Sequence, residues 1–228
     1  MTVFFELALK RTLRQKMLVI AMMVFPVILA TAPHPVDEAP PIGFTLYGLI
    51  ILFSGFLLTK QIIDDRSYGT ITRIAASPTR HYEYLLGHMG AYLFILLIQN
   101  LVFTLIAHAS FESLDISLSM LFLTYAVFSI LSIAFSLFWH MFFRTYATSI
   151  ALYSVIVNMV AMLGGLIVPI PFLPEGIITI GRVLPSYWFA NALQHVYEGD
   201  SIMALLSLFI VLAFAIMFLV IGSKRRLT

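Results

Sequence analysis

Residues 201–222, SIMALLSLFIVLAFAIMFLVIG, decide the fold class, because the whole stretch is apolar and contains no charged side chain. A helix needs about 20 mostly apolar residues to cross the roughly 30 Å hydrocarbon core of a bilayer. Five further segments approach or meet that length, at 17–34, 42–60, 85–108, 117–141 and 147–168. Pro26 interrupts the first of them, where neighbouring helices can satisfy the freed backbone group, so we expect a kink there. The sequence predicts an all-α membrane protein with six transmembrane helices in a single transmembrane domain, 1–228.

The composition excludes a soluble domain. The chain is 61% hydrophobic and 11% charged, whereas soluble domains average about 45–50% and about 25%. It contains no cysteine, which excludes disulfides and thiolate metal sites. The six histidines are scattered without ligand spacing, and the net charge is only +2. We therefore expect no metal site and no nucleic-acid partner.

The distribution of Lys and Arg predicts the orientation. With the N-terminus inside, the inner segments hold twelve of the thirteen basic residues, and Arg182 alone lies outside. Basic residues accumulate on the cytoplasmic side of membrane proteins. We therefore expect both termini in the cytoplasm, and a multi-pass protein of the plasma (inner) membrane of a bacterium or archaeon.

Residues 1–16 precede the first apolar segment and combine two periodic patterns. Apolar side chains recur at helical spacing, and charged ones recur every fourth residue on a neighbouring face. The patterns predict an interfacial helix on the inner membrane surface, with its basic residues toward anionic lipid headgroups. A basic flank that needs no helix is the alternative. The apolar set is Phe5, Ala8, Leu9 and Leu13, and the charged set is Glu6, Lys10 and Arg14.

The loop at 61–84 is the longest cytoplasmic segment and the most polar part of the chain. Asp64 or Asp65 is suited to cap a short helix, Gly69 allows a turn, and Pro78 would end the helix near Ser77. A few apolar side chains rimmed by charge would then face a docking partner. The alternative is a simple tether between two spans.

The segment 169–200 separates the fifth and sixth spans. Prolines at the start of this segment end the fifth span, and two short amphipathic pieces follow at 175–184 and 186–197. Neither piece is long enough to cross, so we expect extracellular or re-entrant helices there, shielded by protein. Tyr187 and Trp188 would also suit an aromatic belt at the membrane surface.

Polar side chains within the predicted spans are neutral. No Asp, Glu, Lys or Arg lies at the centre of a span, which argues against a proton- or sodium-coupled transporter. Two interpretations of the neutral groups remain open: close helix packing with interhelical hydrogen bonds, or a translocation path or subunit interface. The residues concerned are Gln99, Asn100, Tyr125, Ser129, Ser132 and Asn158.

Two stretches resemble a known family. The run DRSYGTI at 65–71, followed by Ile74 and by Ser77-Pro78, resembles the coupling loop of ABC transporter permeases of the type-2 export family. LPSYWF at 184–189 is similar to the extracellular element of that family, in which Pro185, Tyr187 and Trp188 would lie. The sequence departs from the family pattern at Ser67 and Thr72, where acidic residues are usual.

The resemblance implies a subunit without a nucleotide site of its own. Two cytoplasmic ABC ATPase subunits would bind ATP and Mg, leaving no cofactor in this chain, and a second identical or homologous permease subunit would complete the complex within membrane lipids. A phosphate-binding GxxxxGK[ST] loop is absent from the sequence. The residues that would contact the ATPase are Asp64, Asp65, Arg66, Gly69, Thr70, Ile71, Arg73, Ile74, Ser77 and Pro78.

We therefore expect an exporter of a hydrophobic or amphipathic substrate, such as a drug, a lipid-like molecule or a modified peptide, driven by a separate ATPase. A membrane scaffold or immunity subunit without transport activity is the alternative, and a secondary transporter is a third possibility.

Overall fold

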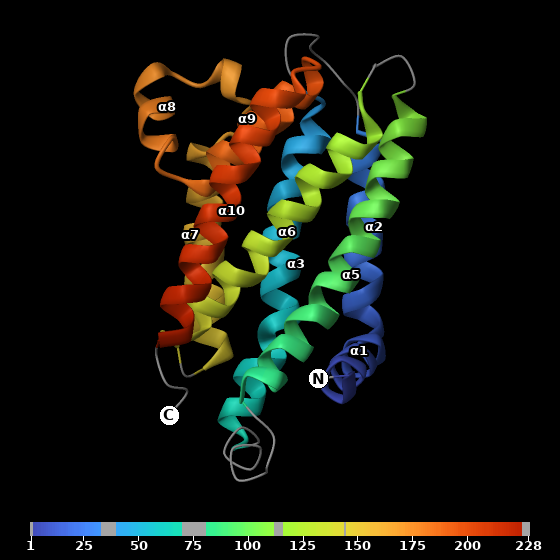
Figure 1. The fold of residues 1–228 in the computed structure, drawn as a ribbon, viewed down its shortest axis with the longest axis vertical. Helices are drawn as coiled ribbons and strands as arrows, with labels where there is room; N and C mark the ends of the chain where they lie inside the picture. The colour runs from blue at the N-terminus through green and yellow to red at the C-terminus, as the bar shows by residue number, and fades with distance from the viewer. Residues whose placement is uncertain (1, 33–39, 70–80, 112–115, 144, 225–228) are drawn as a thin grey trace.

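The computed structural model describes residues 2–32, 40–69, 81–111, 116–143 and 145–224, which form nine α-helices and contain no β-strand. The long helices run side by side as one bundle, with α1 across its lower end and α8 and α9 at its upper end (Figure 1). The end of α10 also lies at the lower end (Figure 1). The bounds are α1 Thr2–Arg14, α2 Lys16–Ala30, α3 Ile42–Ser67, α5 His81–Ser110, α6 Leu118–His140, α7 Tyr146–Leu163, α8 Glu175–Gly181, α9 Pro185–Tyr197 and α10 Ser201–Lys224.

Five helices are long and apolar enough to cross a membrane: α3, α5, α6, α7 and α10. The sixth candidate is the bent pair of α1 and α2, whose axes differ by 81°. The predicted span 17–34 is too long, because α2 ends at Ala30 and its 15 residues cover only about 22 Å. The helix does continue through Pro26, as the sequence predicts.

The fifth predicted span, 147–168, also ends early. Helix α7 stops at Leu163, where Gly164 forms its C-terminal cap and Gly165 adopts a left-handed conformation with φ of +82°. Glycine is favoured in that region because it carries no Cβ. Two glycines therefore end α7 before the proline-rich segment begins.

Helix α6 is the centre of the bundle and packs against α3, α5 and α10. Its contact with α3 is close, because a Cβ at Gly55 would clash with the Ser132 hydroxyl. Small residues at helix interfaces allow such close approach in membrane proteins. Aromatic rings fill the upper part of this core, where Tyr47 stacks on Phe103 with ring centroids 3.9 Å apart.

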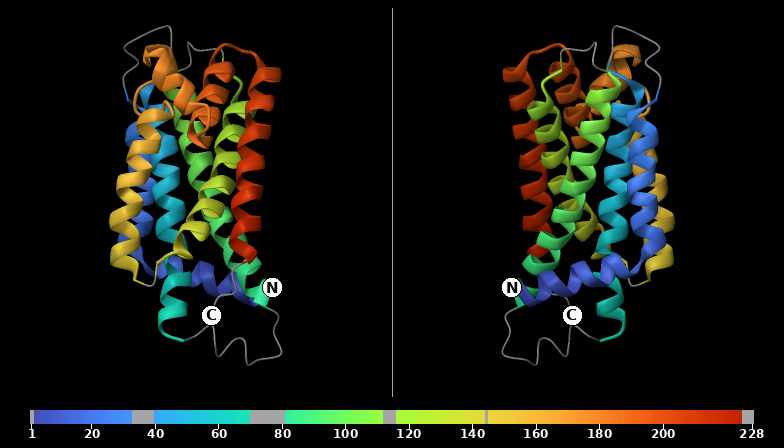
Figure 2. Two further views of the ribbon diagram at one scale, coloured as in Figure 1. Left: turned by 90° about the vertical axis from the view of Figure 1, so that its left-hand side faces the viewer. Right: turned by 90° about the vertical axis from the view of Figure 1, so that its right-hand side faces the viewer.

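The segment before the last span folds as expected into short helices. After a 3-10 turn at Ile170–Phe172, α8 and α9 follow, and Pro185 occupies the first turn of α9. The hydroxyl of Ser186 donates to the carbonyl of Val160 in the last turn of α7, at 2.9 Å. The start of α9 therefore lies beside the last turn of α7, below the upper end of the bundle (Figure 2).

Candidate functional site

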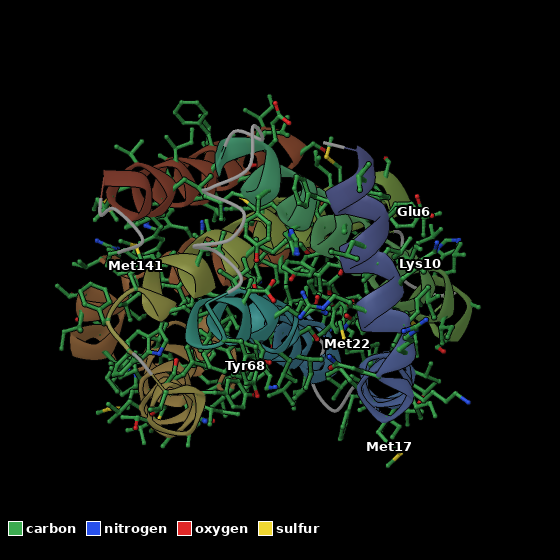
Figure 3. The ribbon with its side chains drawn as sticks, turned by 90° about the horizontal axis from the view of Figure 1, so that it is seen from below. Glu6, Lys10, Met17, Met22, Tyr68 and Met141 are labelled. Atoms are coloured by element: carbon green, nitrogen blue, oxygen red, sulfur yellow. The ribbon has the colours of Figure 1, made fainter. Side chains whose placement is uncertain are left out.

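Helix α1 lies across the lower end of the bundle, nearly perpendicular to α2 (Figure 2). Ala8 and Thr12 are buried against the bundle, and Phe5 packs against the same apolar cluster. Glu6 and Lys10 pair with each other at 2.6 Å on the side that faces away from α3 (Figure 3). The two predicted faces of this helix are therefore present, except that Leu13 is 54% exposed.

One charged residue of α1 turns inward. The guanidinium of Arg11 donates a fork of hydrogen bonds, 2.9 to 3.0 Å long, to the carboxylate of Asp65 near the end of α3. The Asp65 side chain is 5% exposed, and that of Arg11 is 37% exposed. These hydrogen bonds raise the pKa of the Arg11 guanidinium above its ordinary value, although burial opposes the shift. The guanidinium therefore stays charged, and its hydrogen bonds join α1 to α3 through two residues that are 54 positions apart in sequence.

A third helix joins the same carboxylate. The hydroxyl of Tyr84, in the first turn of α5, donates to Oδ2 of Asp65 at 2.7 Å. The ring of Phe4 meets that of Tyr84 edge-on, and the amide of Gln61 donates to the hydroxyl of Thr12 at 2.9 Å. We call Arg11, Asp65 and Tyr84 the lower joint. It ties α1, the end of α3 and the start of α5 together.

Part of the cluster around the lower joint has no protein partner. Gln61 Oε1, His88 Nε2 and the hydroxyl of Tyr92 are buried without a hydrogen bond among the described residues. Buried polar atoms of this kind normally bind ordered water. The surroundings of the lower joint therefore hold several buried polar atoms that can bind water.

Helix α3 extends further than the sequence predicts, and this corrects the expected start of the loop. Asp64 and Asp65 do not cap a short helix, because both lie within the last turns of α3, which continues to Ser67. Lys60 pairs with Asp64 at 2.7 Å one turn earlier, which favours the helical conformation. Gly69 then takes a φ of +69°, so the expected turn lies there.

The structure therefore shows only part of the predicted docking loop. The lower joint links the two helices that flank this loop, through Asp65 near the end of α3 and Tyr84 in the first turn of α5. The side chain of Arg66 is outside the described residues. The other predicted contact residues outside the described part are Thr70, Ile71, Arg73, Ile74, Ser77 and Pro78.

The polar residues of the third and fourth predicted spans lie inside the bundle. Tyr47 donates to Oδ1 of Asn100 at 2.8 Å, and Nδ2 of Asn100 donates to Ser129 at 2.9 Å. Ser129 in turn donates to the carbonyl of Tyr125. The tyrosine hydroxyl of Tyr125 donates to the carbonyl of Phe44 at 3.2 Å. This chain connects α3, α5 and α6, and every side chain in it is buried.

Two further contacts of the same kind lie lower on α3. The hydroxyl of Ser132 donates to the carbonyl of Ile51 at 2.7 Å, and the amide of Gln99 lies 3.4 Å from the hydroxyl of Ser54. Both polar side chains are fully buried. Five of the six predicted polar positions therefore face other helices of the same subunit.

Asn158 differs from the other five. It lies on an exposed face of α7, and its amide donates only to the carbonyl of Ser154 in its own helix, at 2.7 Å. The neighbours Val155 and Met159 are 57% and 60% exposed. Because Asn158 lies within a membrane-length helix, an amide on this outer face meets either lipid or another chain.

At the upper end, Tyr187 is only 7% exposed and so packs inside the subunit. Trp188 is partly buried, and its indole donates to the carbonyl of Arg182 at 2.9 Å. Pro185 begins α9. These contacts hold α9 against the turn after α8.

Sequence reasoning missed two connections. The lower joint is one of them, and the other is His140, whose ring lies 3.0 Å from the hydroxyl of Thr59 and 3.2 Å from that of Ser149. His140 thus links α3, α6 and the first turn of α7. In the sequence, His140 follows Tyr125, Ser129, Ser132 and Ser136 at helical spacing. That spacing alone does not identify the groups that His140 contacts.

The chain belongs to the ABC-2 family of transporter proteins. The family model described as "ABC-2 family transporter protein" matches residues 8–224, which is nearly the whole chain. No curated protein matches the sequence. The chain is therefore a multi-pass membrane permease of an ABC transporter, from a family whose membrane domain lacks a nucleotide-binding domain.

Proposed function

We propose that this chain is the membrane subunit of an ATP-driven exporter and that two separate ATPase subunits dock at the lower end of the bundle. The lower joint carries the proposal, because it joins α1 to the end of α3 and the start of α5, the two helices that flank the predicted coupling loop. Basic residues support a cytoplasmic lower end: Lys10, Arg14 and Lys16 lie on or beside α1 there. Arg182 lies at the other end.

The lower joint gives the docked ATPase a rigid point of attachment. Force applied to the segment between α3 and α5 reaches both helices, and the Arg11–Asp65 pair carries it to α1. Since α3 packs on α6 through Gly55 and Ser132, a displacement of α3 also moves the centre of the bundle. ATP binding can shift the subunit between two states only if the ATPase binds them with different affinity. A rigid joint transmits that difference to α1, α3 and α5 with little local deformation.

We propose that the exposed face of α7 around Asn158 meets the second permease subunit or the substrate between the two. An amide exposed to hydrocarbon without a partner costs free energy. A facing chain or a polar group of the substrate would remove that cost. The buried residues Gln99, Asn100, Tyr125, Ser129 and Ser132 then serve to hold the helices, and the path runs along α7.

A hydrophobic or amphipathic substrate fits this arrangement. The exposed residues of α7 are apolar apart from Asn158 and, in the first turn, Thr148. Among the described residues no charged side chain lies in the middle of a span. Ionic substrates require charged or carbonyl-lined sites along their path.

The first test is the composition of the complex. The full chain, purified in mild detergent from its native membrane, should retain an ATPase subunit in about equal amount, and ATP hydrolysis should depend on both. A scaffold or immunity subunit would retain no ATPase, and a secondary transporter would respond to an ion gradient instead. Either result contradicts the proposal.

The second test addresses the lower joint. Arg11→Ala leaves the carboxylate of Asp65 buried without its cation, so coupling should weaken by about fivefold or more, the usual size of a coupling between sites. The readout is ATP hydrolysis of the assembled complex relative to the ATPase alone. Lys10→Ala is the matched control, because Lys10 is 68% exposed and, within the described part of the chain, pairs with Glu6 on its own helix and with no other residue. Equal rates for the two variants would contradict a coupling role for the joint.

A further inference from the structure

An apolar cavity of about 410 Å³ lies between α6, α7 and α10, with Leu52 of α3 and the start of α9 also lining it. Much of its wall is aromatic: Phe128, Phe135 and Trp139 line it from α6, and Phe218 lines it from α10. Ligand cavities in proteins have volumes of about 300–1,000 Å³. The cavity therefore has the size of a binding site, and none of the residues of the lower joint lines it.

The wall offers no free hydrogen-bonding group. The indole of Trp139 donates to the carbonyl of Ser149 at 3.1 Å, and the hydroxyl of Ser186 donates to the carbonyl of Val160. The other lining side chains are hydrocarbon or aromatic. A polar ligand inside would lose its hydration without compensation, so the occupant must be hydrocarbon.

The cavity opens toward the membrane between α7 and α10. These two helices have almost no direct contact. Seen from that side, they stand apart, and α6 and α9 are visible in the space between them (Figure 2, left). At the rim, Ile156 is 39% exposed and Phe142 is 54% exposed. A molecule can enter here from the bilayer without crossing water.

The shape fits one extended chain. The lining residues of α6 run from Phe128 to Trp139, which corresponds to roughly 16 Å at the rise of a helix. A volume of about 410 Å³ spread over that length is narrow. These dimensions suit a linear hydrocarbon chain.

A cation lies at the upper end of the cavity. Arg182 precedes the lining residue Leu184 by two positions, is exposed, and forms no ion pair with any residue that the structure describes. Guanidinium groups bind phosphate through two parallel hydrogen bonds. This arrangement gives a reason for the one basic residue that departs from the inward distribution of positive charge.

We propose that the cavity binds one acyl chain of a membrane phospholipid whose phosphate lies at Arg182, in the leaflet at the upper end. The bound chain fills the space between α7 and α10 and supports α7, which has few contacts of its own. This inference does not depend on the ATPase proposal, because it concerns only the chain and the bilayer around it.

Fluorescence quenching tests the occupant. The full chain is reconstituted in nanodiscs of phosphatidylglycerol with brominated acyl chains, which quench nearby tryptophans. The chain has two tryptophans, and only Trp139 lines the cavity. Ile156→Phe projects a larger ring into the cavity and should expel the lipid chain, whereas Val155→Phe makes the same type of enlargement beside it on α7 and does not line the cavity. We expect strong quenching in the parent and in Val155→Phe, and clearly weaker quenching in Ile156→Phe.

Equal quenching in the two variants would overturn the proposal. So would weak quenching in all three proteins, which would mean that a second copy of the chain or another protein covers the cavity. The phosphate contact has its own test. Native mass spectrometry after a mild detergent wash should find about one retained phosphatidylglycerol per chain, reduced about twofold to fivefold by Arg182→Gln, as expected for an exposed ion pair. Glu175→Gln removes an exposed charge of opposite sign at the same end of the bundle and should not lower retention. Unchanged retention in Arg182→Gln, or an equal loss in both variants, would overturn the assignment of Arg182.

Discussion

Helices α3 and α7 are both membrane-length and apolar, yet they differ in how much of their surface the subunit covers. The apolar window of α3 is 67% buried, and that of α7 is 22% buried. Polar side chains are found at both helices. Asn100 and Ser132, on neighbouring helices, form hydrogen bonds with residues of α3, whereas Asn158 on α7 donates to a carbonyl of its own helix. A polar residue at membrane depth is therefore a packing group on one helix and an open group on the other, and residue type alone does not distinguish the two.

The same comparison applies to the two ends of the bundle. At the lower end, three helices share one buried carboxylate, Asp65, through Arg11 and Tyr84. On the α7 and α10 side, the helices are separated by a cavity with an apolar wall. The tightly joined region is suited to transmit force, and the loosely packed region is suited to bind or to move.

The largest effect should come from Gly55, where α3 approaches α6. Gly55→Ala would place a Cβ against the Ser132 hydroxyl, which is held by the carbonyl of Ile51, so the overpacking should cost about 1–3 kcal/mol. Thermal unfolding of the purified chain in detergent measures the loss. Gly176→Ala is the control, because a Cβ there meets nothing within 4 Å and alanine favours a helix. If Gly55→Ala is as stable as the parent, α3 and α6 are not packed as described.

A smaller effect is expected at Asn100. Asn100→Leu removes the hydrogen bonds to Tyr47 and Ser129 and leaves both hydroxyls buried, which should cost about 1–2 kcal/mol at the strength of hydrogen bonds within membranes. The measurement is again thermal unfolding. If Tyr47→Phe in the Asn100→Leu background restores no stability, the hydroxyl of Tyr47 is not the group left unsatisfied.

The smallest effect on the isolated subunit is expected at Asn158. Asn158→Leu breaks one bond within its own helix and exposes a leucine where neighbours are already apolar, so stability should change by less than about 0.5 kcal/mol. Assembly or ATP-dependent activity of the complex should nevertheless fall, if this face meets a partner or a substrate. Met162→Leu, at another exposed position of α7, is the control. Unchanged assembly and activity in Asn158→Leu would leave α7 facing only lipid.

Much of the fold could be predicted from local patterns. Five spans lie close to their predicted positions, because a long apolar run must be helical in a membrane to satisfy its backbone. The errors fall at ends: α2 is shorter than predicted, α7 stops at Gly164, and α3 continues through Asp64 and Asp65. Charged residues suggest a loop, but an i,i+4 pair such as Lys60–Asp64 is equally compatible with a helix that leaves the apolar layer.

By itself, the sequence determined the class of the molecule. Apolar length and charge distribution predict a multi-pass helical protein, and the loop at 61–84 resembles the coupling loop of the ABC-2 family, to which the chain belongs. Only the tertiary structure decided which polar groups meet. Arg11 and Asp65 are 54 residues apart, and nothing in the spacing of either pattern pairs them. The physical reason is that hydropathy is a property of each segment in lipid, whereas a hydrogen bond between helices depends on the rotation and tilt that the packing of all the helices imposes.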